Sequence, residues 1–183
     1  MTDAQTCTAF EGHRRVASGS RLEVALHLKR DGRDNVLVFD DSTGRQIDFD
    51  LSGTPEQIAR RLVITVSPRP LGRPKLGVVA REVTLLPRHW EWLNRQPGGA
   101  SATLRRLVDA ARKADDPTDR IRNAQEAADR FMMAMLGDHP GYEEAARALY
   151  AADKERFLHC IAEWPKDLKA YVERLAAPAF TKA

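Results

Sequence analysis

Hydrophobic and polar positions change their period along the chain, and these changes divide it into predicted regions. The short segments 8–10 and 15–17 lie on either side of Gly12 and could pair as strands. Residues 36–39 form a continuous apolar run of strand length, so this strand is expected to be covered on both faces. Apolar and acidic residues alternate over 47–51, the pattern of a strand with one wet face. These patterns predict a small α/β domain over residues 1–66.

Capping chemistry marks two helix starts in this domain. Ser20 is followed three residues later by Glu23, the signature of a capping box, so a helix is expected to begin directly after Ser20. Thr54 and Gln57 repeat the signature around a proline that suits a first helical turn. The β-branched residues of 63–66 predict one more strand after that helix.

The last region, residues 115–183, has the period of amphipathic helices. Asp116 and Pro117 are expected to start the first helix, and Asp153 to cap a later one. Four such helices with short loops predict a helical bundle. The apolar stripe of the first helix consists of Ile121, Ala124, Ala128, Phe131, Met132, Met135 and Leu136.

Between these regions, residues 79–114 predict a strand followed by two helices. Residues 79–86 contain the strand formers Val83, Thr84, Leu85 and Leu86, Pro87 suits the first turn of a helix, and a Pro-Gly-Gly sequence ends that helix. Ser101 is the expected N-cap of the next helix, whose apolar positions recur with helical spacing. The predicted fold class is therefore α+β: a small N-terminal α/β unit, a central strand-helix-helix segment and a C-terminal helical bundle.

A basic linker arm, residues 67–78, precedes the central segment. Its three prolines exclude a helix or an interior strand, so Arg69, Arg73 and Lys75 are expected on an extended backbone. The sequence GRPK resembles the core of an AT-hook, which reads the minor groove, although Leu71 stands where a hook has its first arginine. The alternative is an interdomain linker with solvated charges.

Charge follows the same division. The chain has 183 residues, 43% of them hydrophobic, and a net charge of +3. Residues 67–114 contain ten Lys or Arg and three Asp or Glu, a net charge of +7, whereas the segments before and after carry −1 and −3. A local basic block is typical of a nucleic-acid contact. An arginine-rich helix face that is only solvated is the alternative.

Other function classes find little support in the sequence. Its apolar runs are too short for a membrane span, its beginning lacks the features of a secretory signal, and its two cysteines suggest no disulfide framework. We therefore expect a cytoplasmic protein without a membrane partner. Phosphate-binding glycine loops, nucleophile elbows and metal-binding histidine motifs are missing, so no enzyme, cofactor or metal site is predicted. Asp40, Asp41, Asp48 and Asp50 are expected to be solvated around the second pair of strands.

The central segment resembles the ribbon-helix-helix DNA-binding proteins. The resemblance lies in the order of residues 84–93, which begin with TLLPR, and then of residues 99–108, which begin with GAS. It implies a dimer in which one strand from each protomer forms a ribbon in the major groove. It also implies phosphate contacts at the start of the second helix, at Ala100, Ser101 and Ala102.

The predicted ribbon departs from that class in its side chains. Whichever strand face points outward, only Arg81 and Thr84 are suited to base contacts, and Glu82 would repel phosphate. We therefore expect a dimeric DNA-binding protein, of the kind that regulates transcription, which holds the DNA backbone. A non-catalytic dimeric assembly protein that lacks base reading is the alternative. The predicted nucleic-acid-binding residues are Arg69, Arg73, Lys75, Arg81, Thr84, Ser101, Arg105 and Arg106.

A second resemblance covers nearly the whole chain. The runs GRPKLGVVAREVTLLPRHWEWL, PGGASATLRRLVDAARK and AADRFMMAMLGDHPGYEEAARALYAADKERF resemble a bacterial family known only as a domain of unknown function (2239). This resemblance implies that the predicted parts belong to one architecture, and it implies no activity.

Overall fold

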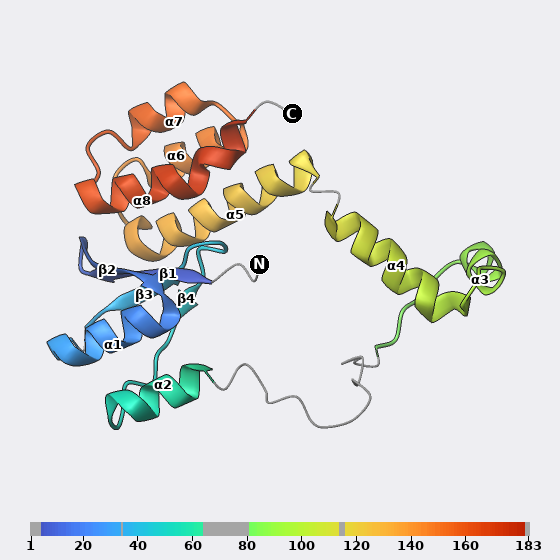
Figure 1. Ribbon diagram of the computed structural model, residues 1–183. Helices are drawn as coiled ribbons and strands as arrows, with labels where there is room; N and C mark the ends of the chain where they lie inside the picture. The colour runs from blue at the N-terminus through green and yellow to red at the C-terminus, as the bar shows by residue number, and fades with distance from the viewer. Residues whose placement is uncertain (1–4, 34, 64–80, 114–115, 182–183) are drawn as a thin grey trace. The chain divides into compact units, whose positions relative to one another are not determined.

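The computed structural model describes residues 5–33, 35–63, 81–113 and 116–181, and it confirms the α+β class. Within these residues, the four strands lie in the N-terminal part, drawn in blue to cyan in Figure 1, and the elements after β4 are helices. The strands are β1 Thr6–Glu11, β2 Arg14–Ser20, β3 Leu37–Asp40 and β4 Gln46–Ile47. The helices are α1 Arg21–Asp31, α2 Pro55–Val63, α3 Pro87–Asn94, α4 Gly99–Lys113, α5 Pro117–Leu136, α6 Tyr142–Tyr150, α7 Lys154–Cys160, α8 Lys166–Ala176 and the 3-10 turn Ala177–Phe180.

The chain forms two compact units. The described residues of Met1–Val66 and Pro117–Ala183 make up one, the main unit, and those of Ser67–Asp116 make up the other, the central unit. The sequence separates the two ends of the chain into an α/β domain and a helical bundle. In the structure, side chains from both ends share one hydrophobic core.

The sheet has the order β2-β1-β3-β4, and all of its neighbouring strands are antiparallel. Ala9 lies opposite Ala17 on β2 and opposite Val38 on β3, so the predicted pairing of the first two strands is confirmed. A turn at Gly12, whose φ is 55°, joins these two strands. Glycine adopts this left-handed conformation without steric cost.

Both faces of the sheet are covered, as the apolar run at 36–39 predicted. Helix α1 lies on one side and α5 with α8 on the other (Figure 1). Val24 and Leu28 of α1 pack against Ala9 and Val38. On the opposite face, aromatic rings from the sheet and the C-terminal helices form a cluster. Its members are Phe10, Phe39, Phe131 and Tyr171.

Phe131 is the centre of that cluster. Its ring centroid lies 5.4 Å from Phe10, 4.8 Å from Phe39 and 4.5 Å from Tyr171. Because all four side chains are at most 2% exposed, the sheet and the C-terminal helices are held together by tightly packed apolar surface. Separate folding of the two ends of the chain would expose this surface.

The predicted helix caps of the main unit are present. Ser20 and Glu23 form a capping box, in which the Ser20 amide donates to the Glu23 carboxylate over 2.8 Å. The Thr54 amide donates to the Gln57 side chain over 2.9 Å, so the second predicted box is confirmed too. Asp153 accepts from the Arg156 amide over 3.0 Å and caps α7.

Two strand predictions differ from the structure. The strand expected at 63–66 is wrong at Val63, which is the last residue of α2, and 64–66 lie outside the described residues. The strand expected over 47–51 is shorter, because only Gln46 and Ile47 pair with β3. Phe49, beyond the pairing, is partly buried against the α1 side of the sheet. Apolar burial, rather than a strand ladder, fixes this segment.

Gly44 brings the turn after β3 close to α5. Its φ is 64°, and a Cβ built on it would lie 2.0 Å from the carbonyl oxygen of Ala127. A side chain at this position would therefore collide with helix backbone, so glycine permits the close approach. The Arg130 guanidinium adds a hydrogen bond of 2.9 Å to the Thr43 carbonyl oxygen. This contact places residues 41–45 against α5.

Replacing Phe131 with alanine should lower the free energy of unfolding by about 3–5 kcal/mol, because it empties the centre of the aromatic cluster. Met133 on the same helix is 63% exposed, and Met133→Ala should change stability by no more than about 0.5 kcal/mol. Denaturant titration followed by circular dichroism measures both. Equal losses for the two variants would contradict the shared core.

Candidate nucleic-acid interface

The central unit is built on a helical hairpin. Pro87 is the first residue of α3, as predicted, and its missing amide costs no hydrogen bond in a first helical turn. Gly98 and Gly99 have φ values of 83° and 74°, and they make the turn between α3 and α4. Because α4 begins at Gly99, Ser101 lies inside its first turn, and the prediction that Ser101 caps the helix is wrong.

The segment before α3 is extended. Residues 81–86 form no strand within this chain, and 79–80 lie outside the described residues. Leu86 has φ −65° and ψ 149°, and its carbonyl oxygen accepts from the His89 amide over 2.8 Å. A ribbon formed between two protomers involves a second chain, so the ribbon itself stays a prediction.

The predicted site residues that the structure describes are all exposed. Arg81 and Thr84 lie on the extended segment, and Ser101, Arg105 and Arg106 lie on α4. Ser101 and Arg105 are four residues apart and share one helix face, with Arg106 beside it. The arm residues have no described position. Arg69, Arg73 and Lys75 all lie outside the described residues.

The arginines of the central unit differ from those of the main unit in their partners. Among the described residues, no carboxylate pairs with the five exposed arginines of 81–106. In the described part of the main unit, at least nine arginines form ion pairs with Asp or Glu. The central arginines therefore keep charge that a phosphate could neutralise. The five are Arg81, Arg88, Arg95, Arg105 and Arg106.

The start of α4 adds to this positive surface. The first turn of a helix exposes amide groups and carries the positive end of the helix dipole. The first turn of α4 holds no acidic side chain, and the one acidic residue of the helix, Asp109, lies further along it. Ser101 and Arg105 follow on the same face, which places a hydroxyl donor and a cation beside this first turn.

A large part of the central unit is apolar and exposed. Between residues 81 and 111, only Leu93 and Thr103 are buried. A small groove of about 300 Å³ lies between the helices, lined by Leu93, Leu104 and Leu107 among others. We call the exposed set the apolar surface. It consists of Val83, Leu86, Trp90, Trp92, Leu107 and Val108, each 38–55% exposed.

This surface has a physical consequence. A helical hairpin with so few buried side chains gains little stability from its own packing, because helices in water depend on burial of an apolar face. Large apolar side chains that remain exposed together are typical of a protein interaction site. The central unit thus carries the properties of a surface that another molecule covers.

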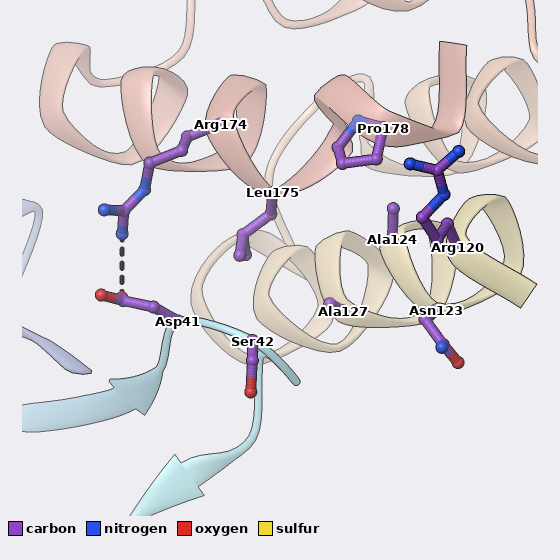
Figure 2. A pocket seen from close by; sticks show the side chains of 9 residues that line it. All are labelled: Asp41, Ser42, Arg120, Asn123, Ala124, Ala127, Arg174, Leu175 and Pro178. Atoms are coloured by element: carbon purple, nitrogen blue, oxygen red, sulfur yellow. Dashed lines mark hydrogen bonds and ion pairs between the residues drawn. The ribbon is translucent and has the colours of Figure 1, made fainter. Parts of the chain in front are cut away.

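The main unit contains a polar cluster that the sequence did not predict. Asp41 Oδ1 accepts from the Thr8 hydroxyl over 2.8 Å, from the Tyr171 hydroxyl over 3.0 Å and from Arg174 Nη2 over 2.8 Å. Figure 2 shows the Arg174 contact as a dashed line. Asp41 was expected to be solvated, and this is wrong, since its side chain is only 11% exposed.

Asp40 was also expected to be solvated, and this is wrong too, since it is only 5% exposed. Its Oδ1 accepts from the Ser42 and Thr43 amides, each over 3.0 Å, and its Oδ2 pairs with Arg21 over 3.1 Å. Burial alone would raise the pKa of Asp40, but the hydrogen bonds from Ser42, Arg21 and Thr43 outweigh it and lower that pKa. Asp40 therefore stabilises the turn after β3 as a carboxylate. No feature of the neighbouring sequence distinguishes a buried aspartate such as Asp40 from a solvated aspartate in a turn.

Neither polar cluster has the composition of a metal site. In the part of the chain that the structure describes, no three His, Cys, Asp or Glu side chains gather to hold an ion. The helices described here also include none with the length and apolar character of a membrane span.

Tyr171 should make stability depend on pH in the alkaline range. Burial, then the Asp41 carboxylate, raises the pKa of its phenol above the unfolded value of about 10. Above that pH the unfolded chain releases a proton that the folded chain retains, so stability is present below it and falls as pH rises. Relative to Tyr171→Phe, the wild type should lose about 1.4 kcal/mol more per pH unit above about pH 10. Urea titrations at pH 9–11 measure the free energy of unfolding of both proteins. The same dependence on pH for the wild type and Tyr171→Phe would contradict the contact between Tyr171 and Asp41.

The chain was compared with known proteins, solved structures and protein families. No curated protein matches the chain, and no solved structure does. A family model described as "Uncharacterized protein conserved in bacteria" (DUF2239) matches residues 6–176, which span the main unit and the central unit together. The chain therefore belongs to this bacterial family.

Proposed function

We propose that this protein binds DNA as a dimer, through the central unit and mainly through the phosphate backbone. The observation that carries the proposal is the set of exposed arginines in the central unit that have no carboxylate partner among the described residues. Arginines that stay unpaired attract phosphate, and their binding releases the counterions that surround DNA.

Helix α4 supplies the contact geometry that the proposal uses. Its first turn presents amide groups beside Ser101 and Arg105, and a helix N-terminus of this kind suits a phosphate group. Arg106 lies on the neighbouring face and extends the basic surface along the helix. The basic arm, with Arg69, Arg73 and Lys75, precedes this unit in the sequence and adds further positive charge.

The same surface offers little for reading bases. Thr84 and Arg81 are the polar residues of the extended segment, and Glu82 beside them is exposed and carries a charge that phosphate repels. Backbone contacts fix the position of a protein on DNA without selecting a sequence. The affinity of the proposed binding therefore depends strongly on salt concentration and only weakly on the DNA sequence.

The apolar surface supports the dimer. It leaves large side chains of both the extended segment and α4 exposed, and a second copy would bury them by a two-fold contact, the commonest symmetry of soluble oligomers. The same surface also supports a second candidate function, a non-catalytic assembly protein that dimerises and ignores nucleic acid. Exposed Glu82 favours that candidate, and the DNA experiment separates the two.

Replacing Arg105 and Arg106 together with glutamine should weaken DNA binding and flatten its salt dependence. Each lost phosphate contact lowers the slope of log K against log salt by about 0.9, so the slope should fall by about 1.8 per protomer. Fluorescence anisotropy with labelled duplex DNA, over a series of salt concentrations, measures it. Arg147→Gln with Arg156→Gln removes the same charge from paired arginines of the main unit and should leave the slope unchanged. No binding of the wild type at low salt would refute DNA binding and leave the assembly protein.

Replacing Leu107 and Val108 together with serine should weaken the dimer by at least about 100-fold. Each buried side chain of this size contributes about 1 kcal/mol or more, and a symmetric dimer loses two from each protomer. Sedimentation equilibrium measures the dissociation constant. Met133→Ser with Tyr150→Ser, two exposed apolar residues of the main unit, is the matched control and should have no effect. A wild type that is monomeric at high concentration would contradict the proposed dimer.

A further inference from the structure

The main unit contains a pocket that the proposed function does not use. It lies among the turn after β3, the first half of α5 and the end of α8, and it has a volume of about 370 Å³ (Figure 2). Small-molecule sites in proteins begin at about this size. All of its lining residues belong to the main unit, so its geometry does not depend on where the central unit lies.

One wall of the pocket is a fixed cation. Arg174 Nη2 donates to Asp41 over 2.8 Å and to the Thr8 hydroxyl over 3.2 Å, and the guanidinium carbon lies 4.7 Å from the centroid of the Tyr171 ring. The ring stacking and the two hydrogen bonds hold the guanidinium in one orientation. A ligand that meets this side chain therefore meets a group that is already ordered.

The polar part of the lining consists mainly of hydrogen-bond donors. Arg120, Arg174 and Asn123 line the pocket together with one aspartate, Asp41, whose Oδ1 already accepts three hydrogen bonds. Figure 2 shows Arg120 on the opposite side of the pocket from Arg174, and Asn123 follows it one turn along α5. Guanidinium and amide donors on one helix face suit a carboxylate or phosphate group.

The remaining lining is apolar. Leu175 and Pro178 contribute one side and Ala124 the other, and the small side chain of Ala124 leaves the space open. Leu175 is 6% and Ala124 8% exposed, so the apolar floor of the pocket is part of the hydrophobic core. A pocket with an apolar floor and a few convergent polar groups is the usual form of a ligand site.

We propose that this pocket binds a small organic anion, a carboxylate or a phosphate ester with a compact apolar body. Arg120 and Asn123 bind the anionic group, and the apolar body lies over Leu175 and Ala124. Arg174, which is already paired with Asp41, supplies the opposite wall.

The test uses the full-length protein, labelled with ¹⁵N, and three probes of similar size: phenylacetate, phenyl phosphate and neutral 2-phenylethanol. At least one anion should shift amide signals of α5 and α8 in a saturable way, with a dissociation constant of about 1 mM or tighter. Comparing the two anions distinguishes a carboxylate site from a phosphate site. No saturable shift with either anion, or equal binding of 2-phenylethanol, would overturn the proposal.

Two variants that change the charge by the same amount locate the site. Asn123→Asp puts a negative charge beside Arg120 at an exposed position of α5 and should weaken binding of the anion by about tenfold. Arg122→Gln also lowers the charge by one, on the same helix but outside the pocket lining, and should change binding by no more than about twofold. Equal weakening by both variants would mean that the anion responds to the general charge of α5, and would overturn the site.

A third variant tests the apolar floor. Ala124→Leu fills the pocket and should abolish the shifts caused by either anion. Far-ultraviolet circular dichroism checks that this variant folds, and unchanged binding in a folded Ala124→Leu protein would place the ligand elsewhere. If the variant does not fold, the exposed Asn123→Asp and Arg122→Gln pair decides the question.

Discussion

Burial of both faces of one short antiparallel sheet is the constraint on which the main unit depends. Antiparallel sheets often leave one face in water, but here α1 covers one face and α5 with α8 cover the other. The second face meets its partners through Phe131, a residue about ninety positions away in the sequence from the strand residue Phe39 that it touches. The N-terminal strands and the C-terminal helices must therefore fold together, and the central unit is an insertion between them.

This arrangement separates two kinds of charged surface. In the main unit, arginines are used internally: Arg21 pairs with Asp40, Arg174 with Asp41, and Arg147 with Glu143. In the central unit, Arg105 and Arg106 have no such partner among the described residues. Paired charges contribute little to a long-range field, whereas unpaired charges of one sign attract an oppositely charged polymer. The proposed contact with DNA rests on this difference in pairing more than on the number of arginines.

Much of the local structure could be predicted from the sequence, because its signals act over a few residues. Ser20 with Glu23, Thr54 with Gln57, and Asp153 each cap the helix they were expected to cap. The same reasoning failed where two local signals compete. At the start of α4, the glycine turn let the helix begin before Ser101, so a good capping residue ended inside the helix. Of the candidate site, the sequence identified exposed arginines, but it could not tell which arginines are paired.

The sequence by itself determined the α+β fold class, the positions of most helices and the confinement of excess positive charge to the centre of the chain. Only the tertiary structure decided that the two ends share one core, that Asp40 and Asp41 are nearly buried, and that a pocket opens beside Arg174. The physical reason is distance along the chain. A cap or a turn depends on neighbours within four residues, whereas Asp41 receives its hydrogen bonds from residues 33, 130 and 133 positions away. Such contacts leave no periodic trace in the sequence, because folding alone brings these residues together.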